Sequence, residues 1–97
     1  DIQGWEAFQR ETGIAVVHDA AAAATSIGTV GTAPVCLSLH ATKVLGIGEG
    51  GAILTQDAGL AGRMTAITGF GFMGHERVSV ARGGNFRLSE YAAAVGL

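Results

Sequence analysis

Lys43 is the residue of this chain whose type and surroundings most directly suggest chemistry. It lies in the segment SLHATKVLGIGEGG, between uncharged neighbours and with no further charge before Glu49. An apolar environment lowers the pKa of a lysine and leaves its neutral amine able to attack a carbonyl carbon. A solvated lysine on a glycine-rich loop is the alternative interpretation, and the residue types alone leave both open.

Asp19 is the second candidate for a chemical role. It ends the segment IAVVHD, whose apolar run followed by polar residues is typical of a strand that is buried on both faces and polar at its carboxyl end. Open α/β sheets bind ligands at that end. Asp19 could therefore be a carboxylate that fixes a cation in a cleft, or a solvated loop residue or helix cap.

Other short motifs carry less information. The segment GIGEGG matches G-x-G-x-x-G over residues 46–51, but the strand-like run AILT follows it, where a dinucleotide site needs a helix. A phosphate-binding P-loop is excluded because Lys43 precedes the glycines. We expect His18 and His40 to satisfy local hydrogen bonds, and we predict no metal, because no Cys, His and acidic residues have metal-site spacing.

The hydrophobic pattern predicts the elements that must position these side chains. Helical spacing of apolar residues and a following Gly13 predict a first helix, and Asp57 and Ser89 are typical N-caps. Residues 69–85 lack periodicity and are expected to form a long loop. The order of elements indicates part of an α/β three-layer domain. The expected helices cover residues 1–13, 58–70 and 90–97, and the expected strands cover 14–19, 34–41 and 51–57.

The composition indicates a piece of a larger protein. The 97 residues are 48% hydrophobic and only 14% charged, which is unusually apolar for so small a domain. The sequence has no initiator methionine, and its last residues, SEYAAAVGL, are expected to form a helix without a C-terminal cap. We therefore expect residues 1–97 to be an internal fragment whose flanking regions are missing.

Charge and cysteine content argue against several partners. Six Lys and Arg residues are spread along a chain of net charge −2, so no basic patch for nucleic acid is expected. No apolar run approaches the ~20 residues of a membrane-spanning helix, which predicts a soluble protein without membrane contact. Cys36 is the single cysteine, which favours a buried thiol and a reducing, cytoplasmic location.

Four segments, in this order and at this spacing, resemble one enzyme family. They are VVHDAAAAA, LSLHATKVLGIGEGGAILTQD, ITGFGF and GGNFRLSEYAAAVGL. They resemble the DegT/StrS-type sugar aminotransferases, which use pyridoxal 5'-phosphate (PLP) on the type I aspartate aminotransferase fold. The resemblance runs from Ile14 to Leu97 and implies an α/β chain from the large three-layer α/β/α PLP-binding domain.

The resemblance implies a role for five residues. Lys43 would form the Schiff base with the cofactor aldehyde and later shuttle a proton, and Asp19 would pair with the pyridine nitrogen. Ser38, five residues before Lys43, would hydrogen-bond the cofactor phosphate. Asn85 would reach the partner subunit's site, which implies a homodimer with shared active sites. Ala22 stands where many relatives carry Gln or His near the ring oxygen, so the substrate subgroup is in doubt.

The resemblance also implies a reaction, namely amino transfer from glutamate to a nucleotide-linked keto sugar in deoxyamino-sugar biosynthesis. Relatives that dehydrate sugars carry histidine in place of the lysine, so Lys43 favours amino transfer. Two alternatives stay open: another PLP-dependent reaction on the same scaffold, such as dehydration or amino-acid amino transfer, and a non-catalytic α/β interaction module. His40, Glu49 and the nearby glycines are expected to shape the lysine turn. The isolated fragment is expected to be inactive.

Overall fold

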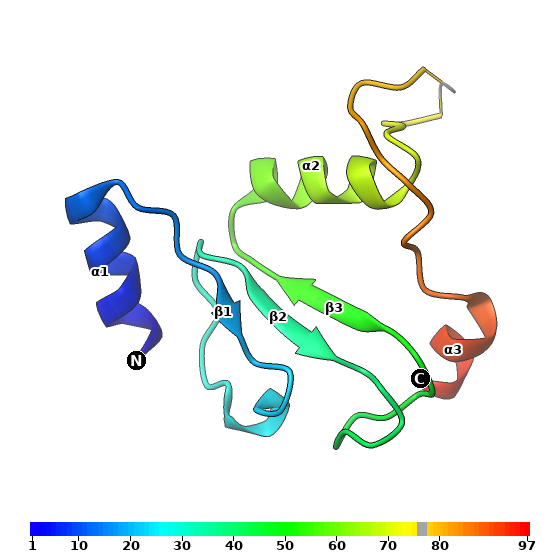
Figure 1. Ribbon diagram of the computed structural model, residues 1–97, viewed down its shortest axis with the longest axis horizontal. Coiled ribbons are helices and arrows are strands. Elements are labelled where there is room, and N and C mark those ends of the chain that lie inside the picture. The colour runs from blue at the N-terminus through cyan, green and yellow to red at the C-terminus, as the bar shows by residue number, and fades with distance from the viewer. Residues whose placement is uncertain (76–77) are drawn as a thin grey trace.

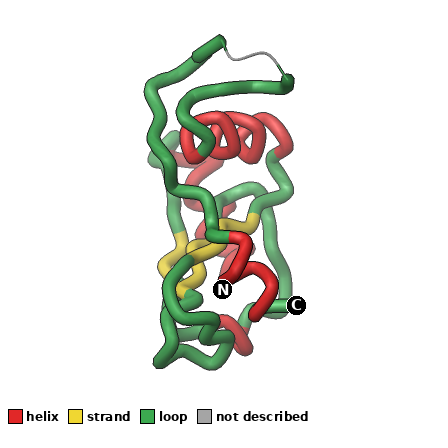
Figure 2. The backbone as a smooth tube through the Cα atoms, turned by 90° about the vertical axis from the view of Figure 1, so that its right-hand side faces the viewer, coloured by secondary structure: helices red, strands yellow, loops and turns green. Residues whose placement is uncertain are grey.

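A three-stranded sheet with helices around it makes up the chain (Figure 1). The structure is a computed structural model that describes residues 1–75 and 78–97. Loops make up much of the chain and join its helices and strands (Figure 2). In chain order the elements are helix α1 (Ile2–Thr12), strand β1 (His18–Asp19), a 3-10 turn (Ala24–Ser26), strands β2 (Val35–Ser38) and β3 (Gly51–Leu54), and helices α2 (Ala58–Thr68) and α3 (Glu90–Val95).

The ends of α1 follow from its sequence. The carboxylate of Asp1 accepts a hydrogen bond of 3.2 Å from the backbone N–H of Gly4, which satisfies one donor of the first turn. Gly13 ends the helix with φ of 71°, a left-handed conformation that glycine adopts without steric cost. The predicted first helix is therefore confirmed.

The later helices begin at the predicted caps. Asp57 accepts from the N–H of Leu60 at 2.9 Å, and Ser89 accepts from the N–H of Ala92 at 3.1 Å. The expectation that the last helix lacks a C-cap is wrong, because the N–H of Gly96 bonds to the last carbonyls of α3. This helix ends at Val95 rather than at the chain terminus.

The sheet has the order β1-β2-β3 and mixed strand directions. Strand β1 runs parallel to β2, with His18 beside Val35 and Asp19 beside Cys36. Strand β3 runs antiparallel to β2, and Ser38 faces Gly51 at the far end of that pair. The carboxyl ends of β1 and β2 therefore lie at the same edge of the sheet, where the sequence placed its polar residues.

The first strand is much shorter than predicted. Pairing begins only at His18, and the preceding Ile14 and Val17 are 58% and 63% exposed. The prediction of a strand buried on both faces is thus wrong for residues 14–17. The physical reason is that, among the described residues, β1 pairs with β2 alone, and residues 14–17 extend beyond the paired length of β2.

The core of the described residues is small. The chain extends 38 × 34 × 17 Å, so few side chains are covered on all sides. Among residues 1–75 and 78–97, the helices are too short to cross a lipid bilayer. The buried hydrophobic residues are Ala20, Ala33, Val35, Ala66 and Ala92.

The segment after α2 is largely the predicted loop. Isolated bridges join Gly69 to Asn85 and Phe72 to Ser79, so the loop folds back on itself. Phe70 has φ of 64°, a conformation that costs energy for a residue with a side chain. Residues 76–77 of this predicted loop lie outside the described residues.

Candidate active site

Asp19 and Ser38 lie on one face of the sheet, near the carboxyl ends of the two parallel strands. Asp19 is the register partner of Cys36, and partners in adjacent strands point to the same face. Ser38 follows Cys36 by two residues, so it shares that face as well. The two polar side chains that were singled out from the sequence are therefore brought together by β-pairing.

The carboxylate of Asp19 is held at the start of the alanine-rich segment. Its Oδ1 accepts a hydrogen bond of 3.0 Å from the backbone N–H of Ala21. This bond fixes the orientation of the carboxylate and leaves Oδ2 to accept from another donor. Asp19 is exposed in the chain, which makes it accessible to a ligand.

The hydroxyl of Ser38 is oriented by the backbone of His40. The backbone N–H of His40 donates to Ser38 Oγ at 3.3 Å. Because the hydroxyl oxygen is the acceptor in that bond, the hydroxyl hydrogen can be donated to a further acceptor. Ser38 is therefore suited to bind an oxygen-rich group such as a phosphate.

Lys43 lies on the loop between β2 and β3 and is half-buried. Its backbone N–H donates to the carbonyl of His40 at 2.8 Å, which closes a tight turn. The residues around it line a cavity of about 210 Å³ that also includes Ala22. Small alanine side chains leave this space open next to Lys43. The lining consists of Ala21, Ala22, Ala24, Thr42, Lys43 and Val44.

The glycine-rich segment after Lys43 forms the return arm of this loop. Gly48 and Gly50 have φ of 103° and 147°, values that favour glycine. Strand β3 begins directly afterwards at Gly51. This confirms that the segment leads into a strand and not into the helix that a dinucleotide site requires.

Asn85 lies apart from this group, in the loop that follows α2. It bridges to Gly69, and its Oδ1 accepts a hydrogen bond of 3.1 Å from Arg87 Nε. Asn85 is exposed and does not line the cavity beside Lys43. Within one copy of the chain, the described contacts therefore do not join Asn85 to the other four predicted site residues.

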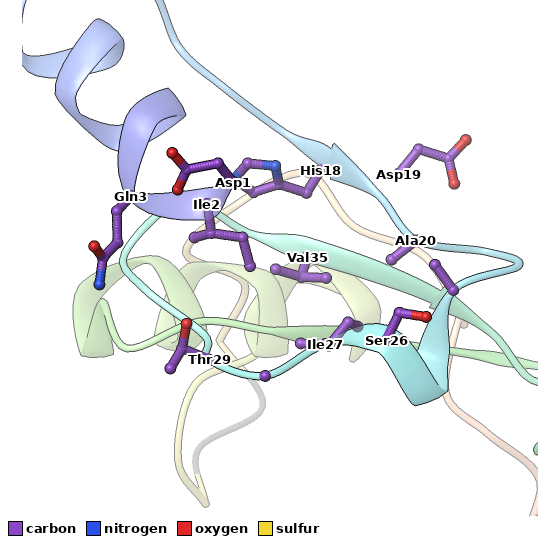
Figure 3. A pocket seen from close by; sticks show the side chains of 12 residues that line it. Asp1, Ile2, Gln3, His18, Asp19, Ala20, Ser26, Ile27, Thr29 and Val35 are labelled. Carbon is purple, nitrogen blue, oxygen red and sulfur yellow. The ribbon is translucent and has the colours of Figure 1, made fainter.

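The prediction for the two histidines is half right. His40 Nδ1 lies 2.9 Å from Thr42 Oγ1, as expected for a locally satisfied side chain. In His18, however, the buried Nε2 has no hydrogen-bond partner among the described residues, so that expectation is wrong. His18 and Asp19 both line a pocket of about 490 Å³ that also includes Asp1 (Figure 3). Alternation along β1 nevertheless turns their two side chains to opposite faces of the sheet.

Thr42 is a residue that sequence reasoning passed over. Its backbone N–H donates to His40 Nδ1 at 3.2 Å, and its hydroxyl contacts the same nitrogen. The only sequence signal is the spacing of two residues, at which a side chain can bond to the local backbone in a turn. Thr42 directly precedes Lys43, so this contact bears on the lysine.

The side chains near this sheet edge form a donor set that fits PLP. A primary amine can bond to an aldehyde, a carboxylate can hold a proton on a ring nitrogen, and a hydroxyl can donate to a phosphate. Lys43, Asp19 and Ser38 supply these three groups from two adjacent strands and the loop that follows.

A solved structure and a family model assign the chain to a class. It is a segment of the PLP-dependent aminotransferase fold, since it matches the crystal structure of a Bacillus cereus ATCC 10987 protein assigned as a PLP-dependent aminotransferase. The TM-score is 0.83 with 33% identity, over 99% of this chain and 27% of that one. The model of the DegT/DnrJ/EryC1/StrS aminotransferase family matches residues 1–97, and the chain belongs to that family. The predicted family and α/β fold class are thereby confirmed.

Three curated relatives come from mycobacteria. Protein Rv3402c and Protein MT3510, from Mycobacterium tuberculosis strains H37Rv and CDC 1551, and Protein Mb3436c, from Mycobacterium bovis, are each 35% identical over 103 residues. The match covers 99% of this chain and 24% of each relative. The chain therefore spans about a quarter of the length of these relatives.

Proposed function

We propose that residues 1–97 are the lysine-bearing part of the large domain of a PLP-dependent sugar aminotransferase. The full-length protein would move an amino group from glutamate to a nucleotide-linked keto sugar. The observation that carries this proposal is the joint placement of Asp19 and Ser38 on one sheet face, with the Lys43 loop directly following β2. Family membership supports the reaction class, while the sugar and the donor follow from resemblance to sugar-modifying relatives.

Each of three side chains has a distinct task in this proposal. Lys43 would hold the cofactor through Nζ and carry a proton at that atom once the substrate has taken its place. Asp19 would keep a proton on the pyridine nitrogen, using the carboxylate oxygen that the Ala21 N–H leaves free. Ser38 would donate its hydroxyl hydrogen to a phosphate oxygen. The bound cofactor supplies an electron-withdrawing ring that stabilises negative charge at the substrate carbon.

The remaining two residues act at the borders of the site. Ala22 would leave room beside the cofactor ring, because a methyl group is all that it adds to the cavity lined by Lys43. Asn85 would act on the site of a second subunit, in keeping with its place outside the lining of that cavity. We propose a homodimer with shared active sites on this ground.

An absorbance measurement on the full-length protein tests the proposal. PLP should give the long-wavelength band of the lysine-bound cofactor, and Lys43→Ala should abolish it. Arg63→Ala is the matched control, because it removes an exposed cation from α2 without touching the lysine turn. Borohydride reduction of the full-length protein followed by peptide mass analysis should place the cofactor mass on the peptide that carries Lys43, the one lysine among residues 1–97.

Substrates are tested in a second step. Glutamate should remove the long-wavelength band, and a nucleotide-linked keto sugar should restore it. An unchanged spectrum in Lys43→Ala would refute the site, whereas a normal cofactor band with no response to any keto sugar would refute only the substrate class.

A further inference from the structure

The turn that carries Lys43 is fixed by the residue three positions earlier. The carbonyl of His40 accepts the Lys43 N–H at 2.8 Å, and the imidazole of the same histidine contacts both polar groups of Thr42. We infer that His40 is a positioning residue, whose neutral imidazole holds the backbone next to Lys43 and thereby aims the lysine amine. Only one part of this inference rests on the proposed function, namely that the amine is aimed at the cofactor.

The hydrogen bonds identify the tautomer of His40. The Thr42 backbone N–H can only donate, so the 3.2 Å bond to Nδ1 requires a lone pair on that nitrogen. In the neutral ring the hydrogen must then be on Nε2. Nε2 faces the carboxylate of Glu49, with 3.6 Å between Nε2 and Oε1. The ring is therefore oriented by one contact on each side.

These contacts join the two arms of the lysine loop. The backbone of the arms is paired by hydrogen bonds from Ala41 N–H to the Gly48 carbonyl at 2.7 Å and from Leu39 N–H to the Gly50 carbonyl at 2.9 Å. His40 and Glu49 stand between these two pairs, with 3.6 Å between Nε2 and Oε1. The loop beyond the paired arms carries Lys43, so the backbone pairing holds the base of its turn.

Helix α3 does not replace this restraint. The outer side of the loop faces α3 across an apolar groove of about 430 Å³, lined by residues such as Leu45, Ile47 and Ala93. Apolar burial is non-directional, so this groove does not by itself set the orientation of the turn. The directional contacts that fix the residue before Lys43 come from His40.

Two substitutions can test whether the hydrogen-bond acceptor at Nδ1, rather than the rest of the imidazole ring, holds the turn. Asparagine can place its side-chain oxygen near the position of Nδ1, and it keeps an acceptor for the Thr42 N–H. Alanine removes the acceptor. Loss of one such bond should change the population of the ordered turn by about fivefold to tenfold.

The first test measures backbone hydrogen exchange in full-length protein without cofactor. His40→Ala should speed exchange at the N–H groups of Thr42 and Lys43 by about fivefold to tenfold, and His40→Asn should stay near wild type. His75→Ala is the matched control, since it removes an exposed histidine from the loop after α2. Equal exchange in wild type and His40→Ala would overturn the inference.

The second test measures how fast PLP develops its long-wavelength band. His40→Ala should slow this step by a similar factor, with His40→Asn restoring it. If His40→Ala fails to fold, Thr42→Val keeps the inference testable: it removes the hydroxyl and keeps the backbone bond, so it should change exchange at Lys43 less than twofold, and a larger change would count against the backbone bond. A wild-type protein without any PLP band would refute the proposed function, while the exchange result would still decide the role of His40.

Discussion

The carboxylate of Glu6 on α1 accepts a hydrogen bond of 3.1 Å from the backbone N–H of Ala33, which lies 27 residues later in the chain. The same oxygen also accepts from the N–H and the hydroxyl of Thr32. These bonds lower the pKa of Glu6 from its ordinary value of 4.5, with the Ala33 N–H as the largest cause and the Thr32 hydroxyl as the next. One side chain therefore ties α1 to the segment that leads into β2.

Glu6→Gln should destabilise the fold at neutral pH and lose this effect in acid. Because the folded pKa of Glu6 lies below the unfolded one, its charged form stabilises the fold at pH values above the unfolded pKa. That contribution disappears as the pH falls through the folded pKa. Thermal unfolding followed from neutral pH to about pH 3 should show the variant and wild type converging.

The matched control for Glu6→Gln is Glu11→Gln, on the same helix. Glu11 is exposed at the last turn of α1, so its substitution should leave the pH dependence close to that of wild type. A stability difference between Glu6→Gln and wild type that persists unchanged in acid would contradict the role of the charge.

Asp19→Asn should leave PLP bound and slow amino transfer. The amide keeps the size of the side chain and can still accept from the Ala21 N–H, but it cannot hold a proton on a ring nitrogen by charge. We expect the turnover rate to fall by about a hundredfold or more. Rapid-mixing absorbance on the full-length protein measures binding and transfer separately.

Asp57→Asn is the control for this substitution. Asp57 caps α2, and asparagine caps a helix about as well as aspartate does, so stability and turnover should both stay near wild type. Near-normal turnover in Asp19→Asn would rule out the proposed role at the ring nitrogen.

Local features of the fold were predictable from the sequence, because their causes are local. Asp57 caps a backbone N–H only three residues away, and Gly13 needs no distant partner to adopt its left-handed conformation. The polar carboxyl end of the strand that ends at Asp19 was also predictable, whereas the pairing that sets Asp19 and Ser38 on one sheet face comes from the structure.

Features that depend on distant partners were not predictable. Apolar residues 14–17 read as a strand, but a strand needs a paired neighbour, and β2 reaches only as far as His18. The hydrogen bonds of Glu6 join residues far apart in the chain, and no local sequence pattern indicates them. The tautomer of His40 depends on the orientation of one ring in a turn, which residue types do not specify.

Mixing inactive subunits should restore activity if the active site is shared between two subunits. Lys43→Ala and Asn85→Ala each disable one contribution, and a mixed dimer has one site with both residues intact. Random exchange should give roughly a quarter of the wild-type activity. Steady-state turnover of the unfolded and refolded mixture measures this value.

The control mixture pairs Lys43→Ala with Asp19→Asn. One subunit would contribute both Lys43 and Asp19 to a site. Each site of every dimer therefore carries one of the two substitutions, and activity should stay low. Activity that stays absent when Lys43→Ala is mixed with Asn85→Ala would argue that Asn85 acts within its own subunit or has no role at the site.

Gly46→Ala should destabilise the lysine loop. A Cβ atom at this position would lie 2.6 Å from the carbonyl oxygen of Ala41 and 3.1 Å from its Cα. Both are backbone atoms of the arm that carries His40 and Lys43, so the clash cannot be relieved by a side-chain rotation. We expect a loss of about 1–3 kcal/mol in the free energy of unfolding and weaker PLP binding, measured by denaturant titration and by absorbance.

Gly62→Ala provides the opposite expectation in the same chain. A Cβ atom there has no neighbour within 4 Å outside the helix's own backbone, and the position lies inside α2. Alanine should therefore stabilise the fold by about 0.5–1 kcal/mol, because it lowers the conformational entropy of the unfolded chain without steric cost. If the two substitutions changed stability in the same direction and by the same amount, the close approach of Gly46 to Ala41 would not be what shapes the loop. Opposite signs, with PLP binding lost only in Gly46→Ala, would tie the shape of this loop to the placement of the lysine amine.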